Sequence, residues 1–106
     1  MKLALCFLSA YLLGSIPVGL LIGRVVKGID IREHGSGNIG ATNVFRLVGK
    51  KWGLAVLFLD ALKGYGAVQI GRLAFEGDLP ALVILALGLT AILGHSFSIW
   101  LSFKGG

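Results

Sequence analysis

The chain has 106 residues, of which 56% are hydrophobic, and its mean hydropathy of +0.88 is too high for a soluble domain of this size. Ten Lys and Arg residues against five Asp and Glu residues give a net charge of +5. No basic run interleaved with aromatic residues indicates a nucleic-acid-binding surface, however. Cys6 is the only cysteine, which excludes a disulfide framework and a cysteine-based metal cluster within the chain. These features favour a single, all-α integral membrane domain with no nucleic-acid partner.

The first apolar stretch, residues 3–23, carries no charge between Lys2 and Arg24. A helix of this length spans roughly 30 Å of hydrocarbon at about 1.5 Å per residue, and membrane helices tolerate a residue such as Pro17. A secretory signal peptide is the alternative. Its apolar region is shorter, roughly 7–15 residues, and it is followed by an A-x-A cleavage site that this sequence lacks. The stretch therefore predicts a first membrane span over 3–23.

A polar and basic segment, residues 24–51, follows and contains the run GSGNIGATNVFR at 35–46. Glycines let main-chain N–H groups face a ligand, and Arg46 can hold phosphate oxygens bidentately. The apolar spacing over 41–48 predicts a short interfacial helix, with the glycine-rich run at its N-terminal end. The run is either an anion site or a tight connecting loop. Its G-x-G-x-x-G spacing is weak evidence for a dinucleotide fold, because no strand precedes it and Asp60, about 20 residues on, falls in an apolar span.

Two further spans are predicted, over residues 52–71 and 79–103. Asp60 and Lys63 interrupt the second span and share one helix face at i and i+3. An uncompensated charge near the middle of the bilayer costs about 2.5–3.5 kcal/mol, so neither side chain is expected to face lipid. The pair either serves packing between helices or takes part in a site. Pro80 fits the first turn of the third span, which ends in the polar run GHSFSIWLSFKGG at 94–106.

The basic residues predict the orientation, because Lys and Arg are concentrated in cytoplasmic loops. The segment between the first two spans has six of them, whereas the next loop has only Arg72, with Lys2 on its side of the membrane. We therefore expect the N-terminus outside and residues 35–46 in the cytoplasm. The third span then returns residues 95–106 to the cytoplasmic side, where the two polar motifs meet.

Together the motifs GSGNIGATNVFR, LDALKG at 59–64 and GHSFSIWLSFKGG resemble the PlsY family, the acyl-phosphate:glycerol-3-phosphate acyltransferases. The resemblance runs over essentially the whole chain. It implies a multi-pass enzyme of the bacterial inner membrane that works in phospholipid biosynthesis. Its members move a fatty acyl group from acyl phosphate to the sn-1 hydroxyl of glycerol 3-phosphate, which yields lysophosphatidic acid and phosphate. No cofactor or metal is implied.

The resemblance also assigns roles to residues. Ser36 and Arg46 match the family's essential hydroxyl and phosphate-binding arginine, and the loop that presents them comprises Gly35, Gly37, Asn38, Gly40, Thr42 and Asn43. The second signature resembles the part that receives the phosphate of glycerol 3-phosphate, and includes His95, Ser98, Lys104, Gly105 and Gly106.

Acyl phosphate is already activated, so the enzyme needs to hold two phosphorylated substrates and stabilise the developing charge, without a covalent nucleophile. The general base is unassigned, and the candidates are His95 and a phosphate oxygen of the substrate. The H-x-x-x-x-D dyad of the other large glycerolipid acyltransferase class is absent, because Ile39 and Trp100 stand five residues after His34 and His95.

Family members continue past the second signature into further spans and a third signature. We therefore expect this chain to correspond to an N-terminal half whose activity alone is in doubt. The rival hypothesis is a non-enzymatic membrane protein, either half of a transporter or an assembly subunit that binds a phosphorylated ligand. Asp60 and Lys63 would then line a translocation path. A homodimer is also considered as a partner arrangement.

Overall fold

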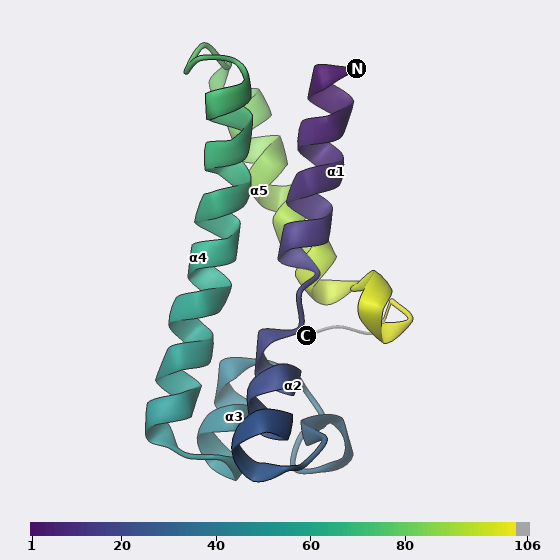
Figure 1. Ribbon diagram of the computed structural model, residues 1–106, viewed down its shortest axis with the longest axis vertical. Helices are drawn as coiled ribbons and strands as arrows, with labels where there is room; N and C mark the ends of the chain where they lie inside the picture. Colours follow the sequence, from purple (N-terminus) through teal and green to yellow (C-terminus); the bar gives the residue numbers. More distant parts are fainter. Residues whose placement is uncertain (104–106) are drawn as a thin grey trace.

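The computed structural model describes residues 1–103, and every regular element among them is helical (Figure 1). The predicted all-α class is therefore confirmed for this part of the chain. The α-helices are α1 (Lys2–Gly14), α2 (Val18–Ile22), α3 (Ala41–Leu47), α4 (Lys50–Ala74) and α5 (Ala81–Ser96). A π-helical turn, η1 (Gly23–Lys27), continues α2, and two 3₁₀ turns are η2 (Ile31–Glu33) and η3 (Ile99–Leu101).

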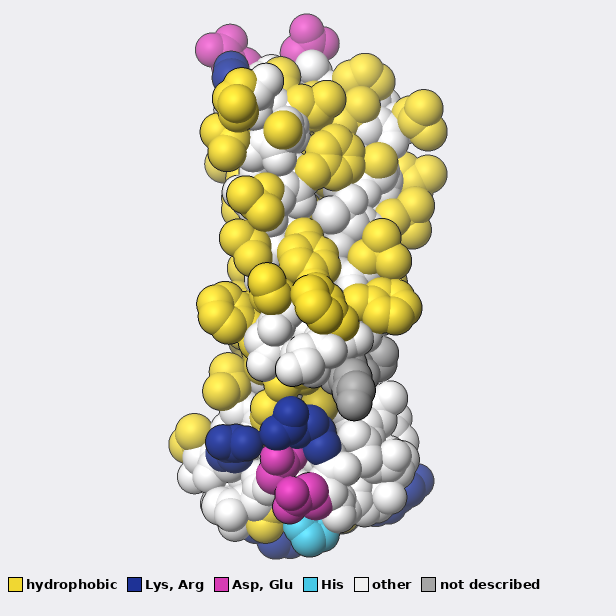
Figure 2. All heavy atoms as spheres, turned by 90° about the vertical axis from the view of Figure 1, so that its right-hand side faces the viewer, with side chains coloured by type: hydrophobic (Ala, Val, Ile, Leu, Met, Phe, Trp, Pro, Cys, Tyr) yellow, Lys and Arg dark blue, Asp and Glu magenta, His cyan; other side chains and the backbone are white. Residues whose placement is uncertain are grey.

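Helices α1, α4 and α5 pack along one another, and α2, α3 and the loop between them gather at the end of α4 that lies opposite the N-terminus (Figure 1). Three stretches are long and apolar enough to cross a membrane, namely Lys2–Lys27, Lys50–Ala74 and Ala81–Leu101. Apolar side chains cover most of the length of the molecule, and charged side chains gather at its two ends (Figure 2). This distribution agrees with the three spans expected from the sequence.

The first predicted span, 3–23, differs from the prediction because it is not one unbroken helix. Helix α1 ends at Gly14, and α2 begins at Val18. Pro17 has no N–H to donate, and proline disfavours helical dihedrals at the residue before it. We call the interruption, residues 15–17, the α1–α2 break. At this break the Ser15 carbonyl accepts from the Ser98 hydroxyl, and the Ile16 carbonyl accepts from the Lys63 ammonium as well as from the Val18 N–H.

The third predicted span, 79–103, also differs, because α5 ends at Ser96 and the chain then turns. Phe97 leaves helical geometry, and the buried Ser98 donates its hydroxyl to the carbonyl of Ser15 at 2.6 Å. The end of α5 is thus fixed by a hydrogen bond to the α1–α2 break.

Two buried clusters hold the helices together. One lies among α1, α4 and α5 and contains Cys6, Ala10, Ala67, Leu87 and Ala91. The other, which we call the lower core, contains Leu20, Ile31, Ile39, Val44, Val56 and Leu101. Because Leu101 belongs to the same buried cluster as Ile39 and Val44, the segment after α5 packs beside the glycine-rich loop. The convergence of the two motifs, predicted from topology, is therefore borne out for their apolar members.

Candidate active site

The glycine-rich loop between η2 and α3 depends on two glycines in the left-handed region, Gly35 at φ +54° and Gly37 at φ +75°. L-residues with a Cβ adopt this conformation at a cost, whereas glycine adopts it readily. A Cβ at Gly35 would also overlap the side-chain oxygen of Asn43. The first two glycines of the motif are therefore explained by the shape of the loop.

Four main-chain N–H groups of this loop bond to neighbouring residues of the protein. The Ser36 N–H donates to Asn43 Oδ1 at 3.2 Å, and the Gly37 N–H donates to the carbonyl of His34 at 2.9 Å. The Asn38 N–H donates to Ser36 Oγ at 3.3 Å, and the Gly40 N–H donates to Asn38 Oδ1 at 2.7 Å. All four N–H groups thus have partners within residues 34–43. Two of them bond the side chains of Ser36 and Asn38 two residues earlier, as short polar side chains readily allow.

Asn43 is the centre of this network. Its side chain is 1% exposed, and its amide nitrogen donates to the carbonyls of Ile31 at 3.0 Å and Asn38 at 2.9 Å, with a longer contact to His34 at 3.3 Å. Its amide oxygen accepts from Ser36. The buried side chain of Asn43 therefore fixes the backbone of the loop. Its predicted contact with substrate remains a prediction.

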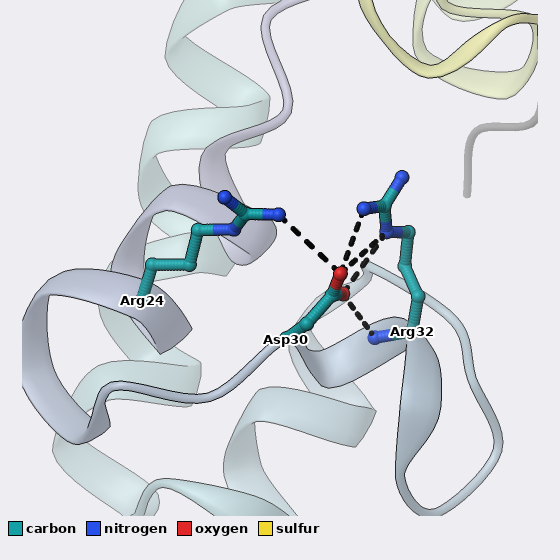
Figure 3. A network of polar contacts seen from close by, with 3 residues as sticks. All are labelled: Arg24, Asp30 and Arg32. Atoms are coloured by element: carbon teal, nitrogen blue, oxygen red, sulfur yellow. Dashed lines mark hydrogen bonds and ion pairs between the residues drawn. The ribbon is translucent and has the colours of Figure 1, made fainter.

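The start of the loop is anchored by Asp30, which lies between two arginines (Figure 3). Arg32 donates to its carboxylate at 2.7 Å and Arg24 at 3.4 Å, and the Arg32 N–H caps the turn at 3.0 Å. The Arg32 side chain holds the pKa of Asp30 well below its usual range, and the carboxylate raises the pKa of Arg32. Asp30 thus stays ionised and fixes the two arginines, neither of which is a predicted site residue.

Arg46 is exposed and forms no ion pair with any residue of the described part of the chain. It projects from the same face of α3 as Thr42, four residues earlier. We call the hollow beside them the Arg46 pocket. Its volume is about 550 Å³, and its lining comprises Ala41, Thr42, Phe45 and Arg46 of α3 with Gly53, Leu54 and Leu57 of α4. The pocket thus combines a cation and a hydroxyl with apolar walls, which suits an amphiphile with an anionic head.

A different cluster lies at the α1–α2 break and combines residues of the motifs LDALKG and GHSFSIWLSFKGG. The Lys63 side chain is 7% exposed, and its Nζ lies 2.8 Å from the Ile16 carbonyl, 3.1 Å from His95 Nδ1 and 3.1 Å from Asp60 Oδ1. The predicted pairing of Asp60 with Lys63 is therefore present. The contact is an ion pair without hydrogen-bond geometry, so Asp60 Oδ1 accepts no hydrogen bond from residues 1–103.

The predicted site residues thus fall into separate groups. Ser36, Asn38 and Asn43 share the loop network, Thr42 and Arg46 share the pocket, and His95 joins Lys63. Ser98 is fully buried against the α1–α2 break. Lys104, Gly105 and Gly106 lie outside the described residues, so their predicted roles are untested.

A family model described as glycerol-3-phosphate acyltransferase matches residues 4–106 of the chain. The match covers all three motifs, the second and third candidate spans, and all but the first two residues of the first span. The chain belongs to the glycerol-3-phosphate acyltransferase family.

Curated relatives from bacteria agree with this membership. Over 106 residues the chain is 51% identical to the glycerol-3-phosphate acyltransferase of Bacillus subtilis, covering 100% of this chain and 53% of the relative. It is 55% identical over 97 residues to the acyltransferase of the same name from Desulforudis audaxviator, covering 92% of this chain and 47% of the relative. The chain therefore spans about half the length of these relatives.

Solved structures give the same result for the fold. Two crystal structures of PlsY, an integral membrane glycerol 3-phosphate acyltransferase, match with TM-scores of 0.86 and 0.84 at 44% and 43% identity. One is its glycerol 3-phosphate form and the other its lysophosphatidic acid form. Both matches cover 100% of this chain and about half of the PlsY chain, 52% and 50%. The membrane fold and the family resemblance expected from the motifs are thereby confirmed.

The acyltransferase motifs did not reveal the part played by the α1–α2 break. Two residues could have indicated it. Pro17 in one apolar span frees backbone carbonyls, and Lys63 in another span needs hydrogen-bond acceptors. Connecting the two required the helix packing. The structure shows that the carbonyl at the break lies within hydrogen-bond distance of the lysine.

Proposed function

We propose that the protein carrying this chain transfers a fatty acyl group from acyl phosphate to the sn-1 hydroxyl of glycerol 3-phosphate. The products are lysophosphatidic acid and inorganic phosphate, and the reaction takes place at the cytoplasmic face of a bacterial inner membrane. The observation that carries the proposal is the Arg46 pocket, in which an exposed guanidinium stands beside apolar walls. An acyl phosphate has the matching form, with an anionic phosphate at the end of an apolar chain.

The chemistry asked of the protein is modest. The sn-1 oxygen attacks the acyl carbon, a C–O bond forms, and the bond between the acyl carbon and the phosphate oxygen breaks. The hydroxyl proton passes to a phosphate oxygen. The departing phosphate therefore carries away both the electron pair of the broken bond and the proton. Positioning and charge stabilisation then supply the rate enhancement. Arg46 offsets the repulsion between two anionic substrates, and the exposed Ser36, held by the loop network, supplies a hydroxyl near them.

A direct assay separates this proposal from the transport hypothesis. The protein is reconstituted in liposomes and supplied with palmitoyl phosphate and glycerol 3-phosphate, without acyl-CoA. Acyl transfer requires equal amounts of released phosphate and lysophosphatidic acid. Uptake of glycerol 3-phosphate without either product would instead favour a transporter, and turnover only with acyl-CoA would overturn the proposed donor.

Arg46→Ala should reduce kcat/KM by roughly 10²–10³, the usual effect of losing one donor that stabilises developing charge. Arg46→Lys should recover part of this loss, because it keeps the charge and loses the bidentate geometry. The control is Lys50→Ala, which removes an exposed cation at the start of α4, outside the pocket lining. Equal losses of kcat/KM in Arg46→Ala and Lys50→Ala would contradict a specific role for Arg46. They would mean that only the total positive charge near α3 and the start of α4 matters.

A further inference from the structure

The ammonium group of Lys63 has neighbours from three parts of the fold. It lies within hydrogen-bond distance of the Ile16 carbonyl at the α1–α2 break and of Nδ1 of His95 on α5. It also forms an ion pair with the Asp60 carboxylate one turn earlier on α4, a contact that lacks hydrogen-bond geometry. An ammonium has three N–H donors and no lone pair, so it can only donate to its neighbours, and the carboxylate balances its charge.

With Lys63 as an ammonium, this geometry assigns a role to each ring nitrogen of His95. An ammonium can approach Nδ1 at 3.1 Å only if that nitrogen offers its lone pair. The proton of a neutral imidazole then resides on Nε2. A doubly protonated ring would instead place two cations in contact, with Nδ1–H directed at the ammonium. The ring also lines a pocket of about 130 Å³ together with Asp60 and Lys63.

We propose that Lys63 is a positioning residue that holds His95 in the Nε2–H tautomer, so that His95 acts as a hydrogen-bond donor and not as the general base. The second half of this statement rests on the proposed acyl transfer. With one ring nitrogen accepting from Lys63 and the other carrying the proton, His95 has no lone pair left for a substrate hydroxyl. The proton of that hydroxyl then goes to a phosphate oxygen.

The tautomer can be measured without any turnover. The protein that carries this chain is labelled with ¹⁵N- and ¹³C-histidine in detergent micelles, and comparison with its His95→Gln variant identifies the signals of His95. We expect one dominant species with a bare Nδ1 and a protonated Nε2. A dominant Nδ1–H species, or an equal mixture in this otherwise unaltered cluster, would overturn the proposal.

Lys63→Met tests whether Lys63 is the group that fixes the tautomer of His95, because methionine keeps much of the side-chain length and removes the N–H donors. We expect the single tautomer to be replaced by a mixture, while the helix content, followed by circular dichroism, stays within about a tenth of the parent. Lys51→Met is the matched control, because Lys51 is an exposed lysine of the same helix. If Lys63→Met retains the single Nε2–H tautomer, another group fixes the ring and the proposal is wrong. If Lys63→Met loses its helix content, Lys63→Gln, which keeps an NH2 donor group, should preserve the tautomer.

Activity supplies an independent test of the role of His95. The amide nitrogen of glutamine occupies nearly the position of Nε2, so His95→Gln keeps a donor there. We expect kcat in the liposome assay to fall less than about tenfold. A fall of about 10²–10⁴, the usual contribution of a general base, would overturn the donor role. Complete absence of acyl transfer in the parent protein would overturn the proposed function and leave the tautomer result standing.

Discussion

At the scale of single residues, the described part of the chain uses buried polar side chains to secure backbone that no helix satisfies. Asn43 does so for the glycine-rich loop, and Lys63 and Ser98 do so for the α1–α2 break. Buried carbonyls without a partner are costly, more so in a membrane, where water is scarce. The sequence identified Asn43 as part of the motif. It could not show which way the amide faces, because that depends on the fold of the twelve preceding residues.

Asn43→Ala should therefore destabilise the loop more than it alters the helices. The change leaves the carbonyls of Ile31 and Asn38 without their donor and the Ser36 N–H without its acceptor. Each unmet buried group costs about 1–3 kcal/mol, so we expect a lower unfolding midpoint and faster hydrogen exchange at the Ser36 amide.

The comparison for this prediction is Asn38→Ala. Asn38 is exposed, and its side chain makes a single hydrogen bond, to the Gly40 N–H. Asn38→Ala should lower the unfolding midpoint by less than half as much as Asn43→Ala does. Equal effects of the two substitutions would contradict the central position given to Asn43.

At the scale of helices, apolar length predicted α4 well, and it predicted the first span and α5 only in part. The start of each long helix follows from hydropathy, which is a local property. The α1–α2 break is instead bonded by Lys63 on α4 and by Ser98, just after the end of α5. The prediction that a membrane span tolerates Pro17 agrees with the structure, in which Lys2–Lys27 is long and apolar enough to cross a membrane. Whether a proline bends a helix or ends it is decided by the partners available to the released carbonyls.

The contact between α1 and α5 leads to a prediction about glycine. A Cβ at Gly94 would overlap the Tyr11 carbonyl, and one at Gly14 would overlap backbone atoms of Ala91. Gly94→Ala should therefore separate the two helices and cost about 1–3 kcal/mol, even though alanine favours helix by up to about 1 kcal/mol. Thermal unfolding in detergent, followed by circular dichroism, measures the difference.

Gly64→Ala is the control for this contact, because a Cβ at Gly64 meets no atom of the described residues within 4 Å. We expect its midpoint to equal or exceed that of the parent chain. A Gly94→Ala protein as stable as the Gly64→Ala protein would show that α1 and α5 do not approach as closely as described.

At the scale of the whole molecule, charge and span number together predicted that the two motifs lie at one end. The structure supports this through Leu101, which shares the lower core with Ile39 and Val44. Topology alone could not predict that His95 lies at the α1–α2 break, bonded to Lys63, because that contact depends on the depth at which α5 ends. It also could not predict that the loop satisfies its own N–H groups.

The orientation in the membrane is the last expectation, and it rests on the excess of basic residues in 24–51 over the turn between α4 and α5. In a background without other cysteines, Glu33→Cys and Asp78→Cys each introduce one thiol at an exposed position. Position 33 lies in η2, which packs on α2 and α3 beside the start of α4, and position 78 lies in the turn that follows the other end of α4. A membrane-impermeant maleimide added to intact spheroplasts should label position 78 and should reach position 33 only after the membrane is opened. The reverse pattern would invert the topology and place the Arg46 pocket outside the cell. Labelling of both positions without permeabilisation would contradict a membrane-spanning arrangement, because the two ends are separated by the apolar length of α4.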